Sequence, residues 1–154
     1  MRLGTCLLFE GRTLQGAHPK LAYFCSAPVE GFYAAVDSSL ALVARSFIEA
    51  LAAEVGEAVR LAQLDKVCVL FVDKCKATAH FETLAQAGKI APGYCTGVGK
   101  AILAFMLRVE QNHALEQQSY VAYTPFTLTS RSALMDPLRI IRTNSLAYDR
   151  EEHG

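Results

Sequence analysis

Residues 97–107 place the strongest constraint on how this chain can fold. The run Gly-Val-Gly-Lys-Ala-Ile-Leu-Ala-Phe-Met-Leu has the length of a helix, and Lys100 is its only charged residue. A helix that is apolar nearly all round has no face suited to water and must be covered on several sides. We therefore predict a layered domain in which this helix lies between other elements.

A second helix is predicted over residues 39–55. Apolar residues recur there at steps of three and four, Arg45 and Glu49 lie on the opposite side, and Gly56 is placed to end the helix. The pattern indicates an amphipathic helix lying on a core. Its predicted buried face consists of Leu40, Val43, Phe47, Leu51 and Val55.

Short β-rich runs follow this helix. Residues 58–64 and 67–72 are separated by Asp65-Lys66, a connection of hairpin length. We predict an antiparallel pair in which the second strand is the more buried. A third strand is expected from Thr78 to Leu84, after a turn at residues 74–76.

The two ends of the chain are less regular. Glycine and proline are frequent in residues 1–35, which predicts a linker or lead-in with little independent fold, followed by one domain over residues 36–154. Asp136-Pro137 is typical of an N-cap and first helical turn, and the helix should close near Asn144. Residues 147–149 could form a strand, for which no partner is expected before the sequence stops.

Charge, targeting signals and cysteines exclude several classes of protein. The 15 basic and 15 acidic residues balance, and the basic ones are scattered, so we expect no direct DNA binding. We find neither a secretory signal nor a membrane span, which predicts a cytoplasmic protein without membrane contact. The five cysteines never form a CxxC pair, so we predict reduced thiols, no metal site and no cofactor.

The glycine-rich segment from Gly93 to Ala101 holds the main candidate site. A phosphate-binding P-loop requires four residues between the first glycine and Gly-Lys, but five intervene here, and Ala101 follows the lysine. The free amides of residues 96–99 at a helix start would still suit a carboxylate. Tight helix packing through small residues is the alternative, and the sequence leaves both open.

Cys95 is a candidate nucleophile, because a helix N-terminus lowers the pKa of a thiol. No histidine is placed as its base, so a buried or pocket-lining cysteine is favoured and no catalytic residue is predicted. Residues 149–153 carry a cluster of charges, which near a terminus is usually a solvated face.

Several separated segments resemble the IclR family of bacterial transcription regulators. Residues 94–104 resemble the family signature His-Cys-Thr-Ala-x-Gly-Lys-Ala-Leu-Leu-Ala, and residues 123–129 resemble Tyr-Thr-Pro-x-Thr-Ile-Thr. Residues 147–154 resemble the closing motif Tyr-x-x-Asp-x-Glu-Glu-x-x-Gly. The match runs in register from about residue 40 to the end, in the order of the family's effector domain.

The resemblance implies an α+β fold, a GAF-like effector domain with an antiparallel sheet flanked by helices, and it implies that the domain is incomplete. It also implies that the chain lacks the family's winged helix-turn-helix domain and is truncated at its C-terminus. By position, Gly97 and Val98 match backbone contacts to a ligand carboxylate, and Asp149 matches an acidic pocket residue. The remaining implied pocket walls are His80, Thr83 and Ala91.

Three residues depart from the family pattern. Ser145 replaces a glycine that follows a helix, Pro137 falls inside that helix, and Tyr94 replaces the usual histidine. The implied function is non-catalytic sensing of a small organic or aromatic acid, with transcription controlled through contacts in a homo-oligomer. The alternatives are an interaction protein that mixes into oligomers of full-length IclR-type regulators, and a non-functional gene remnant.

Overall fold

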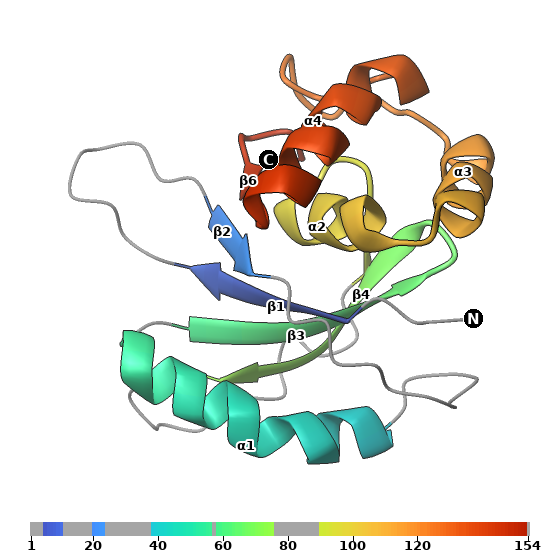
Figure 1. Cartoon of the computed structure of the whole chain (residues 1–154). Helices are drawn as coiled ribbons and strands as arrows, with labels where there is room; N and C mark the ends of the chain where they lie inside the picture. The colour runs from blue at the N-terminus through green and yellow to red at the C-terminus, as the bar shows by residue number, and fades with distance from the viewer. Residues whose placement is uncertain (1–4, 11–19, 24–37, 57, 76–89, 154) are drawn as a thin grey trace.

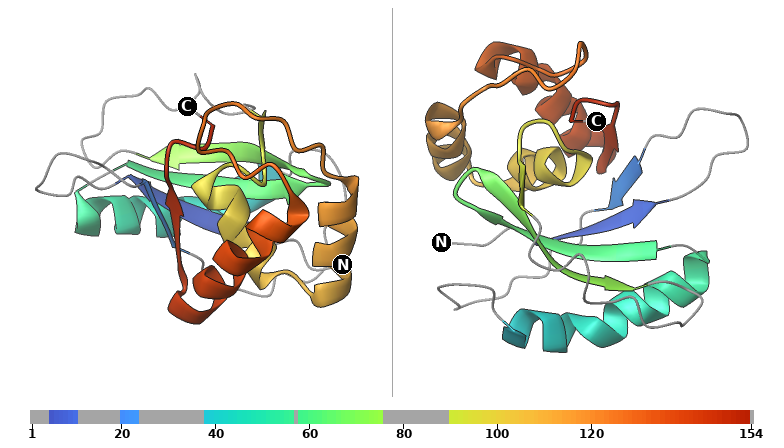
Figure 2. Two further views of the ribbon diagram at one scale, coloured as in Figure 1. Left: turned by 90° about the horizontal axis from the view of Figure 1, so that it is seen from above. Right: turned by 180° about the vertical axis from the view of Figure 1, so that it is seen from behind.

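The computed structural model describes residues 5–10, 20–23, 38–56, 58–75 and 90–153. Its strands form a six-stranded sheet in the order β5-β4-β3-β1-β2-β6, and every neighbouring pair is antiparallel. Helix α1 covers one face of the sheet, whereas α2, α3 and α4 lie on the other side (Figures 1 and 2). The predicted α+β class, with an antiparallel sheet flanked by helices, is confirmed. The elements are β1 Thr5–Glu10, β2 Lys20–Tyr23, α1 Ser38–Val55, β3 Ala58–Asp65, β4 Cys68–Cys75, β5 Ile90–Pro92, α2 Gly97–Phe105, α3 Arg108–Gln117, α4 Arg131–Asn144 and β6 Leu146–Asp149.

The hairpin of β3 and β4 forms as predicted, but its details differ from the prediction. Asp65 pairs with Cys68, and Lys66 in the turn has φ +55°. β4 continues to Cys75, so the predicted turn at residues 74–76 is wrong for its first two residues. β3 is also the more buried strand, because it lies between β1 and β4 over most of its length, whereas β5 pairs only with the first three residues of β4. The strand expected at residues 78–84 lies outside the described residues.

Two segments before residue 36 are strands of the sheet, so the expectation of little structure there is wrong for residues 5–10 and 20–23. β1 pairs with β3 on one side and with β2 on the other. β2 in turn pairs with β6, which corrects the expectation that residues 147–149 would lack a partner. Glycines and prolines separate these short strands, and such short runs carry little periodicity of their own. The domain boundary at residue 35 stays a prediction.

Helix α1 is confirmed, and Leu51 packs toward the sheet as predicted, but the predicted buried face is wrong for Val43 and Phe47. Gly56 ends the helix with φ +73°, and its amide donates to the carbonyl of Ala52 at 3.0 Å. Ile48 and Ala52 are the side chains buried against the sheet, whereas Val43 and Phe47 are each 68% exposed. Arg45 reaches β4 and binds Asp73 at 3.0 Å, so the sheet-facing side of α1 includes this cation. The face that packs on the sheet is therefore the one that carries Ile48, Ala52 and this ion pair.

Helix α2 is confirmed as the buried layer. Residues 97–104 are all buried, and the largest hydrophobic cluster combines α2 with β3, β4, α3, α4 and β6. No helix in the described part of the chain is both long and apolar enough to cross a membrane.

Helix α4 begins earlier than predicted. Ser130 caps it by accepting a hydrogen bond from the amide of Ala133 at 3.1 Å, which leaves Pro137 in the helix interior rather than in the first turn. Side-chain capping by Ser130 and the burial of Leu134 and Leu138 on one face outweigh the missing proline amide. After the helix, Ser145 adopts φ +56°, a conformation that favours glycine.

Candidate functional site

The start of α2 presents backbone amides inside the protein. Thr96 is the N-cap, and its hydroxyl accepts from the amide of Gly99 at 3.2 Å while donating to the carbonyl of Pro92 at 3.1 Å. The first regular helical bond joins the amide of Lys100 to the Thr96 carbonyl. The amides of Gly97 and Val98 lie in the first turn, where a helix offers no acceptor. Both residues are buried, so the helix dipole acts there with little solvent screening.

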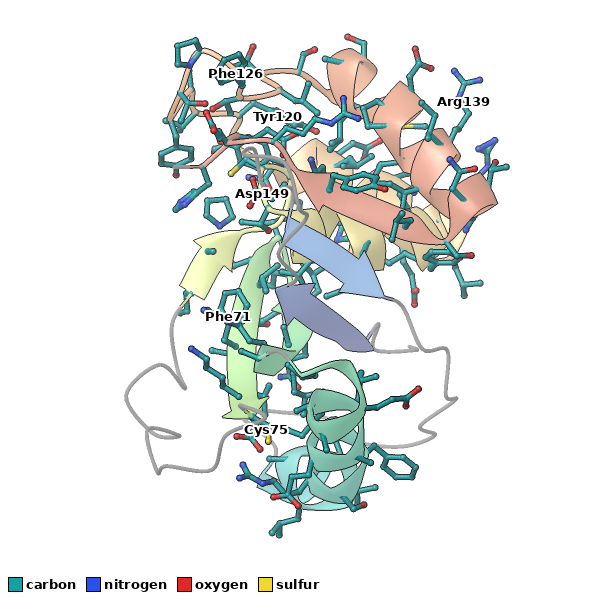
Figure 3. The ribbon with its side chains drawn as sticks, turned by 90° about the vertical axis from the view of Figure 1, so that its left-hand side faces the viewer. Phe71, Cys75, Tyr120, Phe126, Arg139 and Asp149 are labelled. Atoms are coloured by element: carbon teal, nitrogen blue, oxygen red, sulfur yellow. The ribbon has the colours of Figure 1, made fainter. Side chains whose placement is uncertain are left out.

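Strand β6 crosses this helix start and brings Asp149 to it. A Cβ atom on Gly97 would lie 3.0 Å from the Asp149 amide nitrogen and 3.3 Å from the carbonyl carbon of Tyr148. Asp149 is half-buried and lies on the α2 side of the molecule (Figure 3). Three of the predicted site residues, Gly97, Val98 and Asp149, therefore lie together although 52 positions separate the first from the last (149 − 97 = 52).

Of the three other predicted site residues, the structure describes only Ala91. Ala91 is half-buried in β5, where it pairs with Val69 a few residues before the start of α2. Its role as a pocket wall stays a prediction. His80 and Thr83 lie outside the described residues, so their role as pocket walls stays a prediction.

Gly99 is explained by packing. A Cβ atom there would lie 2.1 Å from the carbonyl oxygen of Gly93 and 2.5 Å from its Cα. Gly93 itself packs on the β3–β4 hairpin, where its amide donates to the Val67 carbonyl at 2.9 Å. The close approach of the Gly93 and Gly99 backbones packs α2 against the sheet. At Gly99, tight helix packing through a small residue therefore explains the glycine.

Cys95 is fully buried, and its environment opposes a nucleophilic role. Burial, and then the nearby carboxylate of Asp149, raise the pKa of the Cys95 thiol to about 11. These effects outweigh the lowering that a helix start alone would produce. The group is a neutral thiol at physiological pH.

Tyr94, which stands where the family pattern has a histidine, is a core residue. Its hydroxyl donates to the Val121 carbonyl at 2.5 Å, and its ring meets Tyr120 edge to face at 5.2 Å. Burial raises the pKa of the Tyr94 hydroxyl to about 12, so it stays a donor. Its contacts tie the start of α2 to the segment after α3.

The sequence analysis missed a buried ion pair between Lys100 and Glu152. The two side chains are 4% and 7% exposed, and the ammonium contacts both carboxylate oxygens. The prediction of a solvated face over residues 149–153 is therefore wrong for Glu152. A signal was available, because the lone charge of an all-apolar helix requires a buried partner.

Two threonines hold the segment around Glu152. Thr127 donates to the carbonyl of Glu152 and Thr124 donates to that of Glu151, each at 2.6 Å. The motif at residues 123–129 thus binds the closing motif at residues 147–154. Among the described residues, no cluster of three or more histidine, cysteine or carboxylate side chains could hold a metal ion.

Comparison with known proteins identifies the family. Residues 33–154 match the family model of the bacterial transcriptional regulator IclR C-terminal domain. The chain belongs to this family. It is 30% identical over 110 residues to the HTH-type transcriptional regulator XynR of Escherichia coli K12, covering 71% of this chain and 44% of XynR.

Solved structures agree with the assignment. The IclR protein of Thermotoga maritima aligns with a TM-score of 0.65 at 26% identity, over 76% of this chain and 47% of that one. The PobR inducer-binding domain from Acinetobacter, solved as a double mutant with 3-hydroxybenzoic acid, shares the fold with a TM-score of 0.62 at 24% identity, over 78% of this chain and 68% of that one. The chain spans less than half the length of the transcriptional regulator XynR and of the Thermotoga IclR protein.

Proposed function

We propose that this effector-binding domain senses a small organic or aromatic acid without catalysing a reaction, and that it controls transcription through oligomer contacts. The observation that supports this most is the start of α2, where two buried first-turn residues lie against the strand that carries Asp149. Amides at a helix start favour a carboxylate. The Asp149 carboxylate would accept a hydrogen bond from a hydroxyl group elsewhere on the same ligand.

The charges around this site are compatible with an anionic ligand. Cys95 is a neutral thiol, so it does not repel a carboxylate, and Glu152 is balanced by Lys100. PobR was solved with 3-hydroxybenzoic acid, an acid that carries both a carboxylate and a hydroxyl group. Ala91, together with His80 and Thr83, would line the rest of the pocket.

A thermal-unfolding screen tests this proposal. The purified chain is heated with glyoxylate, pyruvate, benzoate, 3-hydroxybenzoate or gluconate. A ligand at a hundredfold excess over its Kd stabilises the folded state by about 2.7 kcal/mol. In a domain of this size that corresponds to roughly 5–11 °C in Tm. We expect one class of acid to produce such a shift.

Variants localise the effect to the site. Asp149→Asn should reduce the shift, whereas Asp136→Asn, the same change at an exposed position of α4, should leave it intact. A cooperative transition that no acid moves would contradict the sensing function and favour the gene-remnant alternative.

Oligomer contacts are supported by the outer face of α1. Leu42, Val43 and Phe47 are 78%, 68% and 68% exposed, which is unusual for three apolar side chains within two turns. We propose that this face binds a second copy of the chain. Light scattering should show self-association that Phe47→Glu abolishes and Ser46→Glu, at an exposed neighbouring position, does not. If the wild-type chain is monomeric, the proposal that this face binds a second copy is refuted.

The second candidate function is mixing into oligomers of a full-length IclR-type regulator, and the same exposed face supports it. Co-expression with such a regulator should then yield a mixed complex that Phe47→Glu prevents. Separate elution of the two proteins would exclude this function.

A further inference from the structure

The buried pair of Lys100 and Glu152 joins the two elements that form the candidate site. Lys100 lies three residues after Gly97, in the first turns of α2. Glu152 lies three residues after Asp149, beyond the end of β6. Each charge is almost fully removed from water, so separating them would leave an uncompensated charge in the interior. The pair therefore opposes any movement of residues 149–152 away from α2.

The Glu152 carboxylate also contacts the backbone next to Asp149. One of its oxygens lies 3.5 Å from the amide nitrogen of Arg150, the residue that follows Asp149. On the other side of Asp149, the backbone of residues 148 and 149 packs on Gly97. Asp149 is thus held between the start of α2 and the Glu152 carboxylate, which Lys100 of the same helix binds.

The backbone at both ends of β6 is strained. Ser145 and Glu151 have φ of +56° and +61°, a region that residues other than glycine adopt at a cost of about 1 kcal/mol or more. Such conformations persist only where surrounding contacts hold them. At Glu151 those contacts are the hydrogen bond from Thr124 and the flanking anchor of Glu152.

We propose that Lys100 and Glu152 are positioning residues of the effector site, whose buried ion pair holds Asp149 across the start of α2. The inference rests on the proposed function, which supplies the ligand, but the ion pair and its contacts are present in the protein without a ligand. Loss of the pair would release β6 from α2 and weaken acid binding without removing any group that touches the acid.

Cys95 provides a test that needs no effector. Its thiol is fully buried beside Asp149, so an alkylating reagent reaches it only when the site opens. Cys75, half-buried on the opposite side of the sheet against α1, reports opening elsewhere. The experiment measures iodoacetamide labelling of both thiols by peptide mass spectrometry in the full chain.

Two variants separate positioning from stability. Glu152→Gln keeps the shape but leaves Lys100 unpaired, and the double variant Lys100→Met with Glu152→Gln removes both charges. We expect Cys95 to label about tenfold faster relative to Cys75 in both, which corresponds to about 1.4 kcal/mol lost from the closed arrangement. The double variant should recover much of the Tm that Glu152→Gln loses, because no unpaired charge remains. Asp136→Asn, which breaks an exposed pair with Arg139, is the matched control and should label like wild type.

The outcomes are distinct. If Cys95 of the folded double variant is labelled at the wild-type rate, the positioning role is refuted. It is also refuted if the labelling rate of Cys75 increases by the same factor as that of Cys95. If Cys95 labelling accelerates, 3-hydroxybenzoate is added as the probe, and any Tm shift seen in wild type should be smaller in the double variant. If Cys95 labelling accelerates in the variants but no acid shifts the Tm of the wild-type chain, the positioning role is supported. That result counts only against the proposed class of ligand.

Discussion

Replacing Gly99 with alanine should destabilise the protein, although the same change stabilises most helices. Inside a helix, alanine is favoured over glycine by about 1 kcal/mol. If Gly99 only gave the helix freedom or room for a ligand, Gly99→Ala would raise Tm. The contact of 2.1 Å between the added Cβ and the Gly93 carbonyl oxygen predicts the opposite.

The magnitude follows from the atoms that must move. A contact with backbone is not relieved by a rotamer change, and overpacking of this kind typically costs up to about 3 kcal/mol, occasionally more. After subtracting the gain of about 1 kcal/mol in helix propensity, a net loss of about 2 kcal/mol remains. In a domain of this size this lowers Tm by roughly 4–8 °C.

Thermal unfolding followed by circular dichroism measures this difference directly. Gly56→Ala is a useful comparison, because nothing lies within 4 Å of a Cβ there and only its φ of +73° disfavours alanine. Its loss should be about 1 kcal/mol. An unchanged or raised Tm in Gly99→Ala would refute the conclusion that backbone packing against Gly93 determines this position.

Three further predictions concern charge, pH and backbone strain. Lys100→Met should lower the free energy of unfolding by about 3–5 kcal/mol in urea titrations, because Glu152 stays buried without its partner, whereas Arg139→Met in an exposed pair should change it by less than about 1 kcal/mol. The raised pKa of Cys95 means that the folded state keeps a proton that the unfolded chain loses above about pH 9, so stability should fall by about 1.4 kcal/mol per pH unit between about pH 9 and 11. Cys95→Ala should flatten this slope in denaturation curves at pH 8 to 10, and an identical slope would contradict the assignment. Ser145→Gly should raise Tm through relief of about 1 kcal/mol of strain, while Ser145→Ala should not.

The sequence by itself determined those features that depend on neighbouring residues. The periodicity of residues 39–55 and the terminator Gly56 were sufficient for α1, and the uniform apolarity of residues 97–105 was sufficient to place α2 inside the molecule. The hairpin of β3 and β4 was predictable for the same reason, because one short connection joins two β-rich runs. Motifs at fixed spacing indicated the family, and they brought Gly97, Val98 and Asp149 into one hypothesis before their proximity was seen.

Tertiary structure alone decided the features that join distant parts of the chain. Strand β2 is only four residues long, and its pairing with β6 joins residues 20–23 to residues 146–149. The orientation of α1 was misjudged because its buried side chains, Ile48 and Ala52, and its ion pair with Asp73, 28 positions from Arg45, are fixed by contacts with distant strands. Glu152 looked like part of a solvated terminus until its partner 52 positions away was known. Local patterns report what a segment prefers, whereas the burial of a charge and the pairing of a short strand depend on the elements that surround them in space.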